Sequence, residues 1–100
     1  MADDVPEDLD NALRALSHPS RRAIIRLTAR SAVAATELAE RLEVAPATAS
    51  EHLRVLRKTG LIELIATGTW RRYRTVPARV DAVLAALVRE IHLPPAKEQP

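Results

Sequence analysis

The spacing of apolar residues changes from a helical period to a period of two at Gly60, and returns to a helical period after Pro77. The runs 61–66 and 70–76 have β-type patterning and are joined by Thr67-Gly68-Thr69. Two such runs around a short glycine-containing link are typical of a β-hairpin. We therefore expect a mainly α domain with one small β-hairpin before its last helix.

Four amphipathic helices are predicted before the hairpin, because apolar residues recur there every three or four positions. They begin with the acidic turn after Pro6, with Pro19, with Thr36 as an N-cap, and with Pro46. Residues 31–35 link the second helix to the third, with room for one strand pair. Gly60 ends the fourth helix, in the position that glycine prefers. This gives a domain at 8–92, an acidic N-terminal tail at 1–7 and a flexible C-terminal tail at 93–100.

The composition removes several classes of function. The chain has no cysteine, which excludes disulfides, thiolate metal sites and cysteine nucleophiles. It has no apolar run of the length that a membrane span needs, so we expect a soluble, cytoplasmic protein. We find no glycine-rich phosphate loop and no nucleophile paired with a base, and both glycines are explained by turns. We therefore expect neither an enzyme nor a cofactor.

Charge is distributed unevenly along the chain, although its net value is only +2. Residues 1–10 carry five acids and no base. From Arg54 to Arg79 there are seven bases, and Glu63 is the only acid. A basic segment of this density indicates a polyanionic partner.

The third and fourth predicted helices, joined by a three-residue turn, form a helix-turn-helix whose second helix fits a DNA major groove. Burying the apolar stripe of the fourth helix leaves these residues facing the DNA: Ala47, Thr48, Ser50, Glu51, Arg54 and Lys58. The small residues allow the backbone to approach base edges, whereas Arg54 and Lys58 suit phosphates or, for Arg54, a guanine. Glu51 either accepts from a cytosine amino group or is an exposed acid paired with Arg54 or Arg57.

The hairpin offers a second contact with DNA through Arg71, Arg72 and Arg74, since arginine is favoured in the minor groove. Alternation places Arg72 and Arg74 on the same face as Trp70, and Arg71 on the face of Tyr73. We expect Tyr73 to pack against the helices, while Trp70 is compatible with packing or with exposure.

The three histidines do not predict a metal site, since zinc normally takes three or four converging ligands. His18 precedes Pro19 and suits a local cap or a surface position. His52 lies at the edge of the buried stripe, as a packed or hydrogen-bonded side chain. An unusual site formed by His92 with Asp81 of a second copy stays open.

Taken together, LRALSHPSRR (13–22), ELA (37–39), SEHLRVLR (50–57), GLI (60–62) and GTWRRYR (68–74) resemble the ArsR/SmtB family of bacterial winged helix-turn-helix repressors. The resemblance implies a homodimer that binds an inverted repeat near its own promoter and is released by an inducer, often a metal ion. Ala45 departs from the family, which usually has a serine cap there. The family's Cys-x-Cys motif is absent, and only Asp81 remains of its zinc pattern in the last helix. The inducer, if one exists, is therefore unidentified.

The first and last predicted helices carry more apolar surface than a small core requires, so we expect them to form the dimer interface. The residues predicted for it are Leu9, Leu13, Leu16, Val80, Val83, Leu84, Leu87 and Ile91. The alternative is that both helices pack on the core of one chain. The predicted function is a dimeric repressor on double-stranded DNA; the alternative is a winged-helix protein–protein interaction module that does not bind DNA.

Overall fold

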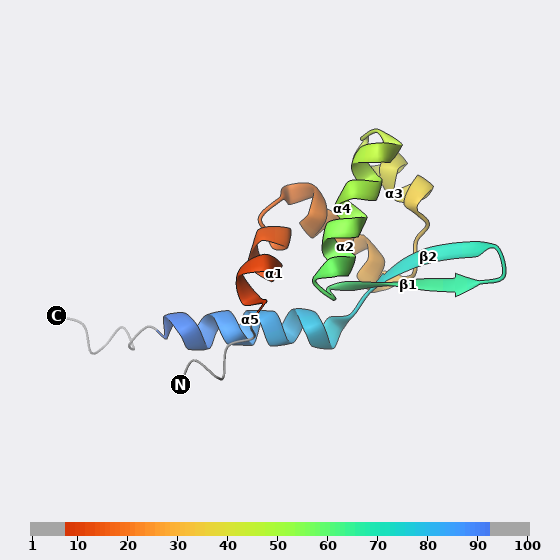
Figure 1. The fold of residues 1–100 in the computed structure, drawn as a ribbon. Coiled ribbons are helices and arrows are strands. Elements are labelled where there is room, and N and C mark those ends of the chain that lie inside the picture. The colour runs from red at the N-terminus through yellow and green to blue at the C-terminus, as the bar shows by residue number, and fades with distance from the viewer. Residues whose placement is uncertain (1–7, 93–100) are drawn as a thin grey trace.

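The computed structural model describes residues 8–92, which form five helices and one two-stranded antiparallel sheet (Figure 1). The elements are α1 (Leu9–Leu16), α2 (Pro19–Arg30), α3 (Ala35–Leu42), α4 (Pro46–Lys58), β1 (Ile62–Thr67), β2 (Trp70–Thr75) and α5 (Pro77–Ile91). This is the predicted order of helices and hairpin. The predicted tails at 1–7 and 93–100, Pro6 among them, lie outside the described residues. The helix predicted after Pro6 begins at Leu9, with Asp8 as its N-cap and Asp10 in its first turn. Among the helices of residues 8–92, none has both the length and the apolar character that a membrane span requires.

A single core joins all five helices to the start of the hairpin. Its largest fully buried apolar side chains are Leu9, Ile24, Leu38, Leu53, Leu56, Leu61 and Val83. Burying a leucine or isoleucine of this kind stabilises a fold by about 1.5–3 kcal/mol. Because α4 contributes both Leu53 and Leu56 to this core, its opposite face is fixed toward the solvent.

Two of the predicted helix caps have different outcomes. His18 is the N-cap of α2, and its Nδ1 accepts a hydrogen bond of 3.1 Å from the backbone N–H of Ser20, which confirms the capping role. The N-cap prediction for Thr36 is wrong, because α3 begins at Ala35 with Ala34 as its N-cap. Val33, the residue before Ala34, is held in an extended backbone pairing with Tyr73 of the hairpin. The helix therefore begins two residues after Val33, before Thr36 is reached.

The link between α3 and α4 is short. Glu43 ends α3 in the left-handed region (φ 56°), and the N–H of Val44 closes the turn on the carbonyl of Ala39 at 3.1 Å. Ala45 has an extended backbone and no capping side chain, while Pro46 begins α4. At the other end of α4, Gly60 adopts φ 78°, where a side chain would be strained.

The hairpin extends from the helical body as a ribbon, visible to one side of α4 in Figure 1. Its register runs from Ile62 opposite Thr75 to Thr67 opposite Trp70. The backbone of Val33 pairs with that of Tyr73 through bonds of 2.9 and 2.8 Å, which confirms the single strand pair predicted for residues 31–35. The base of the hairpin is therefore bonded to the segment that leads into α3.

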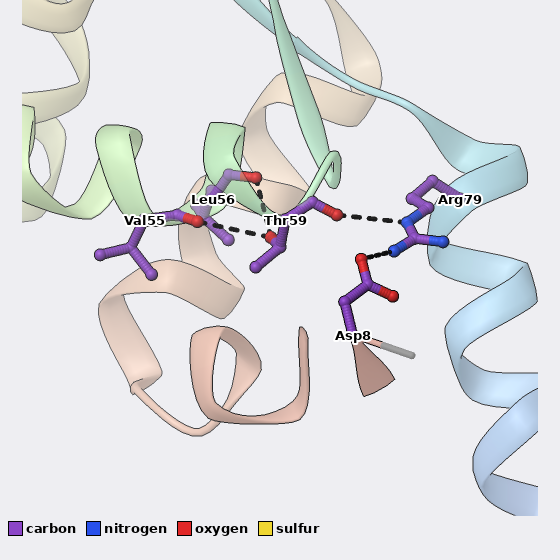
Figure 2. A network of polar contacts seen from close by, with 5 residues as sticks. All are labelled: Asp8, Val55, Leu56, Thr59 and Arg79. Carbon is purple, nitrogen blue, oxygen red and sulfur yellow. Dashed lines mark hydrogen bonds and ion pairs between the residues drawn. The ribbon is translucent and has the colours of Figure 1, made fainter. Parts of the chain in front are cut away.

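A polar network joins the end of α4 to α1 and α5 (Figure 2). The Nε of Arg79 donates to the carbonyl of Thr59 at 3.2 Å, and its Nη2 forms an ion pair with the carboxylate of Asp8. The hydroxyl of Thr59 donates in turn to the carbonyl of Leu56 at 2.9 Å. One arginine thus connects three helical segments that are far apart in the sequence.

Candidate nucleic-acid interface

The outward face of α4 carries every residue of this helix that the sequence predicted to face DNA. Ala49, Leu53 and Leu56 are buried on the opposite face. The predicted residues, all of them exposed, are Ala47, Thr48, Ser50, Glu51, Arg54 and Lys58. The first turns of this face have small side chains, and its last turns are cationic.

Glu51 and Arg54 form a two-point ion pair on this face. Arg54 Nε lies 3.2 Å from Glu51 Oε1, and Arg54 Nη2 lies 2.8 Å from Oε2. The hydrogen bond and the charge of Arg54 lower the pKa of Glu51, and the same contacts raise the pKa of Arg54. Of the two interpretations left open for Glu51, the free chain has the one in which it pairs with Arg54.

A shallow hollow of about 370 Å³ lies between α4 and β2, and we call it the hairpin-side hollow. It is lined by Ser50, Leu53, Arg54, Arg57, Lys58 and Tyr73. Three of these, Leu53, Arg57 and Tyr73, were not predicted as site residues. The cluster of bases Arg54, Arg57 and Lys58 in the sequence could have indicated that Arg57 belongs to the site. Tyr73 is half-buried against the core, as expected, and it also lines this hollow.

The three hairpin arginines are all exposed, but they do not form one cluster. Arg74 pairs with Glu63 across the sheet, with 3.0 Å between Nη2 and Oε2. The guanidinium of Arg72 lies 5.0 Å from the ring centroid of Trp70, a cation–π contact. Trp70 is 64% exposed, so of the two alternatives left open for it, packing or exposure, the structure shows exposure. Arg71 belongs to the opposite face of the ribbon and has no ion-pair partner among residues 8–92.

His52 fixes α4 against α2. Its side chain is buried, and its Nδ1 accepts a bond of 3.2 Å from Arg21 Nε. Its ring centroid lies 4.5 Å from that of His18. Burial lowers the pKa of His52, and the nearby charges of His18 and Arg21 add to the effect. His52 is therefore the packed, hydrogen-bonded histidine that the sequence predicted.

Within residues 8–92, no three side chains of His, Cys, Asp or Glu come together as a metal site would require. His92 ends α5 in the left-handed region (φ 36°) and is exposed, as is Asp81 on the same helix.

The structure divides the predicted dimer residues into two groups. Leu9 and Val83 are 2% and 0% exposed in the core of the single chain, so we remove them from the interface set. These two residues pack on the core of their own chain, as the alternative expected. A second group, Leu13, Leu16, Val80, Leu84 and Leu87, lines an apolar groove of about 500 Å³ between α1, α2 and α5. Three residues of α2 that were not predicted for the interface, Arg22, Ile25 and Arg26, also line this groove. Ile91 lies further along α5 and is 55% exposed.

The segment that contains the helix-turn-helix matches a known protein family. A family model described as a helix-turn-helix domain matches residues 16–65, which span α2, α3, α4 and most of β1. Among curated proteins, the HTH-type transcriptional regulator Rv2034 of Mycobacterium tuberculosis is 36% identical over 80 residues. That alignment covers 80% of this chain and 75% of the relative.

Solved structures agree over a longer range. An ArsR-like transcriptional regulator from Rhodococcus sp. RHA1 superposes with a TM-score of 0.75 at 30% identity, covering 85% of this chain and 79% of that one. The homodimeric winged helix-turn-helix DNA-binding domain Mb0332 of Mycobacterium bovis, described as a possible ArsR-family regulator, gives 0.69 at 27% identity, with 88% and 83% covered. The chain therefore belongs to the ArsR family of winged helix-turn-helix transcriptional regulators.

Proposed function

We propose that this regulator binds double-stranded DNA as a homodimer and represses transcription from an inverted-repeat operator. The observation that carries the proposal is the outward face of α4 and its neighbour β2. Small exposed side chains occupy the first turns of α4, whereas Arg57 and Lys58 near its end have no ion-pair partner among residues 8–92. A helix with small side chains in its first turns and cationic side chains near its end suits base contacts at its start and phosphate contacts at its end.

The hairpin extends the same surface. Arg57 and Lys58 share the hairpin-side hollow with Tyr73 of β2, so a phosphate seated there contacts both elements. Arg71 and Arg72 lie further out on the ribbon, where they reach the backbone or minor groove beside the major groove that α4 occupies. Arg74 contributes less, because Glu63 already neutralises it.

The apolar groove between α1, α2 and α5 supports a second copy of the chain as partner. On α5, Leu84, Val88 and Ile91 are 48%, 70% and 55% exposed. Contiguous apolar surface of this kind marks an interface. The relative from M. bovis is a homodimer by its description. A two-fold dimer sets its two α4 helices about 34 Å apart, in successive major grooves.

The test is fluorescence anisotropy with a duplex taken from the region upstream of the chain's own gene, against a scrambled duplex of the same composition. We expect a preference for the genomic duplex and a steep dependence on salt between about 50 and about 200 mM. Arg71→Gln with Arg72→Gln is expected to reduce the log–log slope by about 0.9 for each phosphate that is no longer neutralised. Arg89→Gln removes one positive charge near the far end of α5 and is the control, for which the slope is expected to stay unchanged.

Equal affinity for both duplexes would overturn the operator proposal. An absence of duplex binding at low salt would favour the winged-helix protein-interaction module instead.

A further inference from the structure

A second hollow lies on the other side of α4, between that helix and α1. Its volume is about 360 Å³, at the small end of the range for ligand pockets. It is lined by Asp8, Asn11, Arg14, Ala15, Arg54, Val55, Lys58 and Thr59. We call it the α1-side hollow. It combines an apolar part, buried Ala15 and half-buried Val55, with three cationic side chains.

Of the three cationic side chains that line this hollow, Arg54 is paired with Glu51, which lies outside it, and the other two have no acidic partner among residues 8–92. Asp8 is the single acid among its lining residues, and its carboxylate is paired with Arg79 (Figure 2). Arg14 Nη1 donates to the amide oxygen of Asn11 at 2.9 Å and has no acidic partner among residues 8–92. Lys58 likewise has none in the part of the chain described. A site with cations beside apolar side chains suits a ligand that carries a negative head group on an apolar body.

Two of these cations belong to both hollows on α4. Arg54 and Lys58 line the α1-side hollow and also the hairpin-side hollow, where the proposed DNA contacts lie. An anion held on the α1 side therefore engages the ammonium group of Lys58 that a DNA phosphate also requires, and it competes with Glu51 for the guanidinium of Arg54. Arg14, by contrast, lines only the α1-side hollow of the two and is absent from the proposed DNA surface.

We propose that the α1-side hollow binds a small organic anion, a carboxylate or phosphate on an apolar body, and that its occupation releases the regulator from DNA. The regulatory part rests on the proposed function, whereas the binding of the anion does not. By linkage, the factor by which the anion weakens DNA binding equals the factor by which DNA weakens anion binding.

The first experiment uses the purified chain without DNA. Benzoate and phenyl phosphate serve as probes, benzamide as the uncharged analogue of benzoate, and sodium chloride keeps the ionic strength constant. We expect saturable changes in the amide chemical shifts of Ala15, Val55 and Thr59 with at least one anion, and none with benzamide. The probe that binds more tightly identifies the head group.

Variants then assign the site. Arg14→Gln is expected to weaken anion binding about tenfold, the change that one charge-assisted hydrogen bond accounts for. Arg30→Gln is the matched control, because Arg30 is also an exposed arginine in the last turn of a helix but does not line this hollow. Its anion affinity stays that of the wild type.

The second experiment adds the operator duplex. The anion is expected to raise the Kd of the wild type for DNA, while Arg14→Gln keeps its DNA affinity and loses the response to the anion. No saturable shifts with either anion, or equal shifts in Arg14→Gln, would overturn the site. Weaker DNA binding by Arg14→Gln itself would also overturn it, since Arg14 then serves the duplex. Saturable shifts in a chain that binds no DNA would confirm the site and reject the proposed function and its regulation.

Discussion

Arg79 connects the end of α4 to α1 and α5, and its replacement tests whether this connection stabilises the domain (Figure 2). Arg79→Met removes the guanidinium but keeps most of the aliphatic stem, which lies beside Gly60. It abolishes two interactions: the bond to the carbonyl of Thr59 and the ion pair with Asp8. The methionine stem retains the packing, so the measured change in stability reports mainly the polar interactions.

The expected magnitude follows from how exposed each partner is. The side chain of Arg79 is 27% exposed, and its bond to the Thr59 carbonyl is partly buried, which is worth about 1–1.5 kcal/mol. Asp8 is 43% exposed, so solvent screening reduces the ion pair to about 0.5 kcal/mol. We therefore expect Arg79→Met to lower the free energy of unfolding by about 1.5–2 kcal/mol.

The assay is urea unfolding followed by circular dichroism, at one protomer concentration because the stability of a dimer depends on it. Asp8→Asn alone is expected to cost about 0.5 kcal/mol, and the double variant to show a coupling of similar size that shrinks at high salt. If Arg79→Met cost no more than Asp8→Asn, the bond to Thr59 would contribute nothing. If both variants matched the wild type, the connection between the three helices would have no energetic role.

Three further outcomes concern DNA binding, pH and assembly. Glu51→Gln frees Arg54 and removes a carboxylate from the proposed DNA surface, so we expect about threefold tighter binding to every duplex. If a binding-site selection showed that the variant had lost its preference at one base pair, Glu51 would instead contact a base. Because burial lowers the pKa of His52, the unfolded chain takes up its proton at a higher pH than the folded one, and stability falls as pH drops below 6.5. Urea unfolding from pH 5 to 8 is expected to show this slope weakened in His52→Gln, and an unchanged slope would assign it to other groups. Leu84→Glu places a charge on the exposed apolar face and is expected to convert the proposed dimer to a monomer in sedimentation. An unchanged sedimentation coefficient would place the interface elsewhere.

The sequence predicts the order of elements well because each element has a local cause. Proline at the first position of α2 and α4, and the φ 78° of Gly60 after α4, are properties of single residues and their neighbours. The buried stripe of α4 follows from spacing alone, so the residues on its outward face follow as well. The outward placement of Arg54 and Lys58 needed no tertiary information.

Long-range contacts explain what the sequence did not predict. The helical spacing of Leu9 and Val83 cannot tell whether a stripe is covered by its own chain or by a second copy, and both are buried within one chain. Thr36 has the chemistry of a cap, but pairing between Val33 and Tyr73 decides where α3 begins. Arg79 was counted only as one more base of a cationic segment. Its role depends on Asp8, 71 residues away, which no local pattern contains.

The relative placement of α4 and the hairpin depends on α2, the element that contacts both through buried polar groups. On one side, Arg21 of α2 donates to His52 of α4. On the other, the hydroxyls of Thr28 and Thr75 lie 2.8 Å apart, and that of Thr75 also donates to the carbonyl of Ile25. A buried hydroxyl left without its partner costs more than the bond itself contributes, so this contact resists sliding of β2 along α2. Since both elements of the proposed DNA surface are tied to one helix, we expect them to meet a duplex as a preformed pair, which reduces the ordering cost that loose elements would add on binding.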